Sequence, residues 1–307
     1  MALDSLQKHM LEQIADLHDI PEGAYNIRNN GEALGRRTTA NIDIVPKTDK
    51  PGIDIIIKPG TKNESVHIPV IVSKAGLKDL VYNDFYIGED ADVTIVAGCG
   101  IHCAGDDTSE HDGIHEFHLA KGARVKYIEK HYGEGDGKGK RILNPVTIVN
   151  QDEDSYMEML TTQIKGVDST KRETKAYLKD RATLIIKENL MTHGNQTAET
   201  NFNVELNGED CTTDVVSRSV ARDESYQVFY SNILGNAKCY GHSECDGILM
   251  DKGRVKAVPS LDATDLDAQL IHEAAIGKIA GEQIIKLMTL GLTEEEAEEQ
   301  IINGFLK

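Results

Sequence analysis

The chain holds two groups of side chains that could bind a metal or carry sulfur, and the denser group lies in its first half. This group combines thiols with imidazoles, which are soft and intermediate ligands for zinc and iron. It consists of Cys99, His102, Cys103, His111, His115 and His118. If residues 114–119 form a strand, His115 and His118 point to opposite faces and cannot both reach one ion. Two interpretations stay open: a metal centre that uses the two thiols with His102 and His111, or histidines that fill polar positions in a β-rich core.

The second group lies near residue 240 and repeats these ligand types. Cys239, His242 and Cys245 fall within one short run together with Glu244. In an extended strand Cys239 and Cys245 share a face, but they lie about 20 Å apart at ~3.3 Å per residue. One strand therefore cannot supply a complete site, and further ligands must come from strands about 4.8 Å away or from a second subunit. Cys239 could equally be a small buried residue of the core.

Motifs for nucleotide and nucleophile chemistry are missing. The sequence has no G-x-x-x-x-G-K-[ST] phosphate loop and no G-x-S-x-G elbow. We therefore expect a chain that binds no nucleotide and is not an enzyme. The alternative is a metal-dependent enzyme whose first Cys/His group surrounds one ion in the β core. A polysaccharide-binding protein ranks last, because aromatic residues make up 5% of the chain and none is Trp.

Length and charge narrow the class of protein further. The chain has 307 residues with 33 basic and 51 acidic side chains, a net charge of −18. This charge argues against a nucleic-acid partner, which requires clustered Lys and Arg. The apolar runs are strand-sized and the N-terminus has no uninterrupted apolar core, so neither a membrane span nor a signal peptide is expected. Five cysteines are an odd number, which suits free thiols in the cytoplasm better than a disulfide framework.

The elements that position these groups fall into three regions. Residues 1–50 are expected to form a helical N-terminal region, residues 51–261 a β core, and residues 262–307 a helical C-terminal region. The core has short Val-, Ile- and Thr-rich runs between turn residues and no sustained helical period, which predicts many strands. A turn residue, a small or polar residue and an alternating strand recur loosely in it, as at Asp90–Ile95 and Asp180–Ile185. This repeat favours stacked β rungs, with a β-sandwich as the competing architecture.

Helices are predicted at both ends. Apolar residues at steps of three and four over Met1–Ile20 predict an amphipathic helix that ends at Pro21. Near the C-terminus a helix is predicted over Ala280–Leu290, and Thr293 is expected to cap another. We expect these helices to cover the open ends of the β-stack, whose edge strands would otherwise expose unpaired backbone groups.

The C-terminal third resembles the SufB/SufD family, the scaffold subunits of the Suf iron–sulfur cluster assembly machinery. The resemblance rests on the ordered blocks G-H-S-E-C-D-G-I-L-M at 241–250, A-V-P at 257–259, H-E-A-A-I-G-K-I at 272–279 and G-L-T-E-E-E-A at 291–297. A weaker match upstream joins Ala97-Gly98-Cys99 to His111. The resemblance implies a mainly β protein, a right-handed parallel β-helix with short helical N- and C-terminal regions. It also implies a scaffold for cluster assembly and transfer that holds the iron–sulfur cluster transiently.

The resemblance also suggests roles for single residues. Cys99 matches a core cysteine associated with receiving sulfur, while Cys245 and Glu273 match B-type residues tied to cluster building. His272 matches a D-type histidine at the interface where clusters assemble, and Cys239 is a further candidate ligand. A second B-type cysteine has no counterpart, because Gly253 stands in its place.

The partners follow from the same resemblance. A SufC-like ABC-type ATPase is expected to dock on the C-terminal helices, forming an assembly of the SufBCD kind, and a sulfur donor protein is expected to supply sulfur. Because the chain combines B-like and D-like residues, we expect it to pair with itself as a homodimer.

Overall fold

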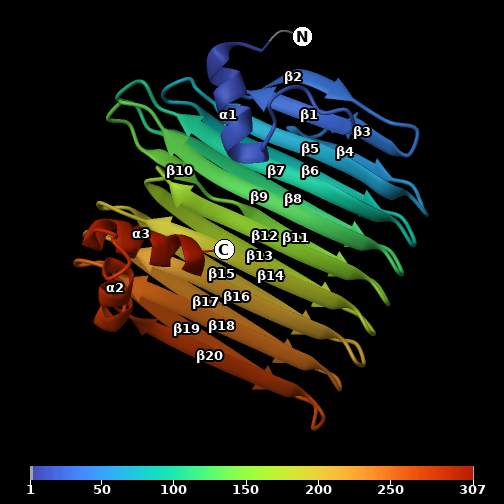
Figure 1. Cartoon of the computed structure of the whole chain (residues 1–307). Coiled ribbons are helices and arrows are strands. Elements are labelled where there is room, and N and C mark those ends of the chain that lie inside the picture. Colours follow the sequence, from blue (N-terminus) through green and yellow to red (C-terminus); the bar gives the residue numbers. More distant parts are fainter. Residues whose placement is uncertain (1–2, 307) are drawn as a thin grey trace.

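The computed structural model describes residues 3–306, which form a parallel β-solenoid of about eight turns (Figure 1). Residues 1, 2 and 307, at the outer ends of the two expected helical regions, lie outside the described residues. In the described part, the strands form two ten-stranded sheets, and neighbouring strands run parallel except for two antiparallel pairs at the N-terminal edge. The expected parallel β-helix with short helical ends is confirmed.

Each sheet receives alternate strands of the chain. Sheet A has the order β2-β1-β5-β7-β9-β12-β14-β16-β18-β20. Its strands are β1 (Ala24–Asn29), β2 (Glu32–Arg37), β5 (Lys62–Val72), β7 (Asp92–His102), β9 (Arg124–Glu134), β12 (Tyr156–Lys165), β14 (Thr183–Thr192), β16 (Thr212–Ala221), β18 (Tyr240–Leu249) and β20 (Gln269–Gly277).

Sheet B stacks the remaining strands in the order β19-β17-β15-β13-β10-β8-β6-β4-β3, with β11 following β10 between β8 and β13. Its strands are β3 (Ile42–Pro46), β4 (Gly52–Ile57), β6 (Lys78–Ile87), β8 (Ser109–Leu119), β10 (Arg141–Leu143), β11 (Val146–Gln151), β13 (Ser169–Leu178), β15 (Thr197–Leu206), β17 (Tyr226–Gly235) and β19 (Arg254–Ala263). Strands thus run from Ala24 to Gly277, on both sides of the expected core segment.

The core lies between the sheets, because side chains alternate between the interior and the outer face along each strand. In the N-terminal turns the interior is apolar and aromatic: Phe85 stacks on Phe117 with ring centroids 4.3 Å apart, and Tyr127 meets Phe117 edge-on. Burying one such ring stabilises the fold by about 1.5–3 kcal/mol. The alternation gives every turn of the solenoid one inward row of side chains from each sheet.

The loose sequence repeat marks the corners that lead into sheet A. At Asp90 and Asp210 the chain turns through the left-handed conformation (φ 54° and 56°), and a small residue follows before the strand begins. Ala91, Ala123, Ala182, Cys211 and Cys239 take this small-residue position, each fully or almost fully buried. The repeat is loose because the turns differ in length, whereas a small buried residue recurs at each of these corners.

The N-terminal helix α1 (Ser5–Ala15) begins with a capping box between Asp4 and Gln7. Asp16 ends the helix in the left-handed conformation, with φ 53°. The span expected from Met1 to Ile20 was therefore too long, because the chain leaves the helix before it reaches Pro21.

This helix lies flat on the outer face of sheet A over β5, β7 and β9 (Figure 1). Met10 and Ile14 of this helix face the sheet and are fully buried. The contact needs glycine on β7, because a Cβ at Gly98 would lie 2.1 Å from the carbonyl oxygen of Ile14 and one at Gly100 would lie 2.4 Å from the Met10 methyl. The backbone around Cys99 is thus covered from outside by α1.

Helices α2 (Gly281–Met288) and α3 (Glu294–Phe305) follow the last strand, close to the expected positions. Thr293 caps α3 in a capping box with Glu296, which confirms the expected start. Within the described residues, none of the three helices has the length and apolar character that a bilayer-spanning segment requires.

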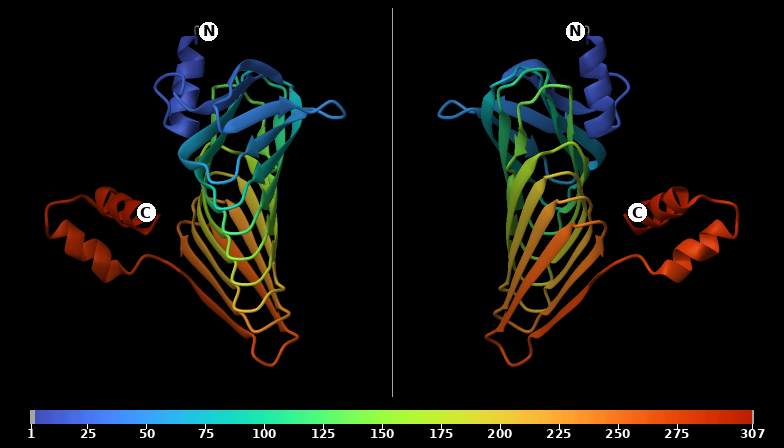
Figure 2. Two further views of the ribbon diagram at one scale, coloured as in Figure 1. Left: turned by 90° about the vertical axis from the view of Figure 1, so that its right-hand side faces the viewer. Right: turned by 90° about the vertical axis from the view of Figure 1, so that its left-hand side faces the viewer.

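The helices do not cover the ends of the stack, so this expectation was wrong. Figure 2 shows α2 and α3 beside the solenoid, with its C-terminal end left bare. The reason is that α3 finds its apolar partner on the side of the stack, where Ile302 and Leu306 pack against Val220. As a result β19 and β20 remain the unpaired edge strands of the two sheets, with mostly exposed side chains.

Candidate functional site

Cys99 lies on the inner side of β7 and is 5% exposed. The imidazoles of His111 on β8 and His131 on β9 act on its thiol, and His131 is its neighbour in the register of sheet A. Burial alone would raise the pKa of Cys99, but the positive charges of the two imidazoles outweigh burial and lower the pKa to about 7. The lowered pKa favours the thiolate of Cys99 near neutral pH, and the thiolate is the form that attacks sulfur or binds iron.

His111 is fixed from behind by a buried carboxylate. Its Nδ1–H donates to Asp79 Oδ2 at 3.0 Å, and Asp79 also accepts from Arg28 at 3.1 Å. Burial would lower the pKa of His111, but the Cys99 thiolate and the Asp79 carboxylate raise it to about 10. His111 thus remains a cation and stabilises the thiolate across the neutral range.

His131 connects Cys99 to a second buried carboxylate. Its Nε2 lies 3.5 Å from Glu129, and its Nδ1 lies 3.3 Å from the amide oxygen of Gln163. Burial would lower the pKa of His131, but the Glu129 charge above all raises it to about 9. Two imidazolium groups therefore surround one buried thiol.

A column of polar side chains continues from Glu129 through the interior. Arg172 of sheet B donates to Glu129 at 2.5 Å and lies 3.6 Å from Glu188. Ser217 donates to the other oxygen of Glu188 at 2.8 Å. In sheet A, residues paired in register on successive strands form a row that runs along the interior. The row consists of Glu129, Thr161, Glu188, Ser217 and Cys245.

These charges are buried but paired. Burial would raise the pKa of Glu129, but the Arg172 guanidinium holds it well below its usual range. The column spans four rungs of about 4.8 Å, so its ends lie roughly 19 Å apart. It joins the Cys99 end of the interior to the Cys245 end without leaving the space between the sheets.

Cys245 faces the interior near the bare end of the solenoid. Burial, with the charges of Glu188 and Asp246, raises the pKa of Cys245 to about 12. The thiol is therefore protonated in the free protein, in contrast to Cys99. A metal ion would be needed to hold it as a thiolate.

His272 enters the same interior from β20, the last strand of sheet A. Its register partner is Ser243, whose Oγ lies 2.7 Å from that of Ser231 across the interior. Burial lowers the pKa of His272. Neither of its buried ring nitrogens has a hydrogen-bond partner within residues 3–306. A neutral imidazole without a partner beside a thiol-bearing strand is suited to bind a metal ion.

The comparison with protein families decides what kind of chain this is. The family model described as "SUF system FeS cluster assembly, SufBD core domain" matches residues 82–305. The chain belongs to the SufBD family. The resemblance seen in the sequence is thereby confirmed, and it covers strands from β6 to β20 together with α2 and α3.

Relatives of known family support this membership. An iron–sulfur cluster assembly SufBD family protein of Methanothermobacter thermautotrophicus is 29% identical over 263 residues, 83% of this chain and 62% of that protein. Its counterpart in Archaeoglobus fulgidus is 29% identical over 264 residues, 84% of this chain and 69% of that protein. A Pyrococcus horikoshii member is 27% identical over 301 residues, 96% of this chain and 84% of that protein. The chain spans less than two thirds of the first of these relatives.

In this SufBD chain, the residues suggested as cluster ligands divide between two faces of sheet A. Cys245 and His272 face the interior, whereas Glu273 points outward opposite Glu244. Cys239 stands apart in the corner above Cys211, about 20 Å along the strand from Cys245. Cys245 and His272 therefore face the interior from neighbouring strands, two residues apart in register, whereas Cys239 occupies a small-residue position of the corner.

Gly253 explains the missing second cysteine. It forms the corner before β19, and a Cβ there would lie 2.2 Å from the carbonyl oxygen of Ala221. A side chain at this position would collide with the backbone of the rung below. In this chain the corner has no room for a thiol.

The residues of the alternative metal centre do not converge. His102 lies outside sheet A and bonds Glu134 at 2.9 Å, while Cys99 and His111 lie inside. Cys103 is buried in the loop after β7, where its thiol donates to the Gly105 carbonyl at 3.3 Å. His102 and Cys103 are therefore not part of the Cys99 environment, whereas His111 is.

Several functional candidates were missed by the sequence analysis. His131, Glu129, Arg172 and Glu188 are buried between the sheets, although isolated charged residues normally indicate a solvated face. The sequence did contain a signal for one part of this interior. Cys99, His131 and Gln163 follow one another at intervals of 32 residues, which is the length of one turn of the solenoid here.

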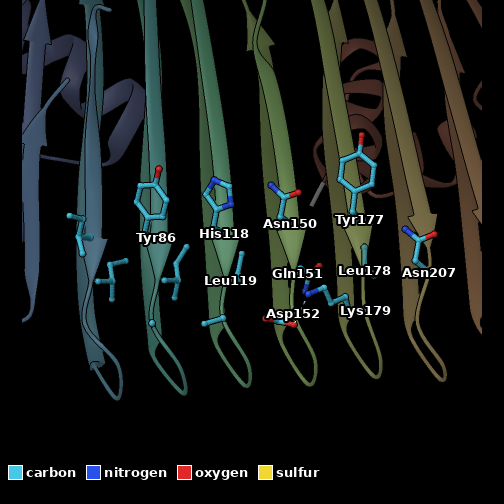
Figure 3. Close-up of a pocket in the computed structure, with 15 residues that line it drawn as sticks. Tyr86, His118, Leu119, Asn150, Gln151, Asp152, Tyr177, Leu178, Lys179 and Asn207 are labelled. Atoms are coloured by element: carbon cyan, nitrogen blue, oxygen red, sulfur yellow. Dashed lines mark ion pairs between the residues drawn. The ribbon is translucent and has the colours of Figure 1, made fainter. Parts of the chain in front are cut away.

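A broad groove of about 650 Å³ lies elsewhere, on the outer face of sheet B. Figure 3 shows Tyr86, His118, Asn150 and Tyr177 side by side on neighbouring strands along it. Tyr86 stacks on His118 with ring centroids 5.0 Å apart. Of the described residues in the two candidate groups, His118 lines this groove, whereas Cys99, His111, Cys245 and His272 lie in the interior.

Proposed function

We propose that this chain is a scaffold on which iron–sulfur clusters are assembled, with Cys99 as sulfur acceptor and Cys245 and His272 as cluster ligands. Membership of the SufBD family implies the role in cluster assembly. The observation that carries the assignment of residues is the polar column, which connects an activated thiol at one end of the interior to an unpartnered imidazole and a second thiol at the other.

The chemistry at Cys99 is a thiol exchange. The Cys99 thiolate attacks the outer sulfur of a persulfide on a donor protein, and the donor departs as its own thiolate. No oxidant or reductant is needed, because the S–S bond is broken and re-formed. The two imidazolium groups keep Cys99 ionised for attack and afterwards stabilise the anionic persulfide.

We propose a homodimer from the apolar side chains that the last two strands leave exposed. Leu261 and Ile276 stand at inward positions of β19 and β20, yet both are more than one third exposed. A second copy meeting the same end would bury them and would bring two copies of His272 near one symmetry axis. A homodimer therefore completes both the core and the cluster site.

The ATPase is proposed to dock on α2. In this helix, whose eight residues are all described, no side chain is buried, and Ile285 is 62% exposed. Leu290, just after it, is 76% exposed. A short helix with an unpartnered apolar face suits helix-in-groove recognition, and the nucleotide chemistry would then reside on the partner.

Anaerobic reconstitution tests this function. The apoprotein is incubated with ferrous iron and inorganic sulfide, desalted, and analysed for bound iron, acid-labile sulfide and visible charge-transfer absorption. Wild type should retain iron and sulfide together, and Cys245→Ala should lose both. Cys211→Ala, a buried thiol in a corner, is the matched control and should behave as wild type. Equal retention by Cys245→Ala, or stoichiometric zinc in the protein as purified, would contradict the proposal.

A further inference from the structure

A second group of metal ligands lies on the outer face of sheet A, behind the proposed cluster site. A ring nitrogen of His242 and carboxylate oxygens of Glu244 and Glu273 all lie within 4.8 Å of one another. His242 and Glu244 stand on β18, two residues apart, and Glu273 is the register partner of Glu244 on β20. The three side chains therefore converge because period-two alternation sends them all to the same face.

The group has an excess of negative charge, although the Arg218 guanidinium on β16 acts on Glu244. Glu244 and Glu273 lie directly opposite each other on neighbouring strands, and like charges in this position destabilise a sheet. Asp246 adds a third carboxylate on the same face of β18. A cation bound between Glu244 and Glu273 would turn this repulsion into attraction.

His242 is oriented as a metal-binding histidine. Its Nδ1–H donates to Asp214 Oδ1 on the neighbouring strand β16 at 2.8 Å. This bond places the lone pair of the neutral ring on Nε2, and a carboxylate behind a ligating imidazole is the usual support for a metal-bound histidine. One imidazole and two carboxylates form an intermediate-to-hard donor set that suits ferrous iron.

We infer that His242, Glu244 and Glu273 form a surface site for a ferrous ion, which loads iron before it joins sulfur at Cys245. The inference rests on the proposed function for the identity of the ion. Its place supports the loading role: Glu244 immediately precedes Cys245, and Glu273 immediately follows His272, so the outer site and the interior ligands share the same two strands. Because β20 is the edge strand of sheet A, ferrous iron would pass from one face to the other around its free edge, by ligand exchange and without a change of oxidation state.

Anaerobic binding of ferrous iron in the absence of any sulfur source tests the site. The apoprotein is titrated with ferrous iron, and free iron is measured after equilibrium dialysis. Wild type should bind one ion per chain, and His242→Ala and Glu244→Gln should each weaken binding at least tenfold. Asp214→Asn should weaken it about 10- to 100-fold, because it removes the support of the His242 ring.

A matched control exists on the other sheet. His118 and Glu116 also form an outward pair, at 3.3 Å on β8, but belong to no three-ligand group among the described residues. His118→Ala should therefore leave iron binding unchanged. Circular dichroism of each variant establishes that it is folded.

Two results would overturn the inference: unchanged iron affinity in both His242→Ala and Glu244→Gln, or loss of iron binding in Cys245→Ala to the same extent. A different result would contradict the proposed function alone. If iron binds as described but Cys245→Ala still builds a cluster from iron and sulfide, the scaffold assignment is wrong and the surface site stands.

Discussion

Cys99 and Cys245 are chemically different although both are buried cysteines of the same β interior. Two imidazolium groups lower the pKa of Cys99 to about 7, whereas burial and two carboxylates raise that of Cys245 to about 12. The first thiol is therefore ready to react with a persulfide at neutral pH, and the second becomes a thiolate only when a metal ion binds it. This difference supports our proposal that sulfur uptake and cluster binding occur at opposite ends of the column.

A thiolate titration tests the state of Cys99. Absorbance near 240 nm should show one thiolate that appears as the pH rises through about 7 and that is missing in Cys99→Ala, because Cys211 and Cys245 have raised pKa values of about 11 and 12. Sulfur uptake from a persulfide donor should fall in parallel as the pH drops below 7. His111→Gln should move the midpoint upward by more than one pH unit. A wild-type midpoint above pH 8.5 would show that the imidazoles do not activate this thiol.

The sequence predicted Cys99, Cys245 and His272 but not what surrounds them. Cys99 and His131 are 32 residues apart, whereas Ser217 and Cys245, one rung apart at the other end, are separated by 28. Because the turns vary in length, the positions that stack in the interior cannot be counted from a fixed period. Arg172 and Glu188 therefore resemble surface charges in the sequence, although they pair inside the solenoid.

At the scale of elements, α1 packs closely on β7 because β7 has glycine at the points of contact. Gly98→Ala should displace the helix, because the added Cβ would lie 2.1 Å from the Ile14 carbonyl oxygen. We expect a loss of about 1–3 kcal/mol in the free energy of unfolding and faster hydrogen exchange over α1. Gly281→Ala is the control, since its Cβ would meet no atom within 4 Å. If Gly98→Ala has the stability and exchange of wild type, the close contact between α1 and β7 is not present in solution.

The two C-terminal helices differ in how they pack. α3 attaches to the solenoid through Ile302 and Leu306, while α2 leaves Ile285 and Met288 exposed. Removal of residues after Leu290 would delete α3, which packs against α2 and attaches to the solenoid, so α2 should lose its fixed position. Capture of the proposed ATPase partner should then be lost while the β-type circular dichroism stays intact.

A point substitution separates docking from folding more cleanly. Ile285→Asp should reduce co-purification of the ATPase at least tenfold, because a charge would be placed in the apolar contact. Ile164→Asp provides the control, since Ile164 is 40% exposed on the solenoid itself. ATPase capture by Ile285→Asp at the wild-type level would exclude α2 as the docking helix.

At the scale of the whole molecule, the fold could be predicted further than the site. Short alternating strands without crossover helices indicated a stack, and Thr293 marked the start of α3. The position of the helices could not be predicted, because it depends on which strand ends present apolar partners. Val220 and Ile248 do so on the side of the stack, and this draws α3 away from the bare end.

The bare end makes a testable prediction about assembly. Leu261 sits at an inward position below Ile233, a core residue of the preceding rung. Wild type should sediment as a dimer at micromolar concentration, and Leu261→Arg should shift it to a monomer. Leu80→Arg, at an exposed leucine on β6, should remain dimeric. A wild-type monomer at tens of micromolar would contradict self-association through this end.

The most direct test of the central claim compares two sulfur sources for cluster assembly on Cys99→Ala. The protein is incubated anaerobically with ferrous iron, and sulfur comes either from a persulfide-carrying desulfurase with a dithiol reductant or from free sulfide. Wild type should build the cluster from both sources. Cys99→Ala should fail with the desulfurase and succeed with free sulfide, because only the first route needs a thiolate to accept sulfur. Cluster formation by Cys99→Ala from the desulfurase at the wild-type rate would contradict the account.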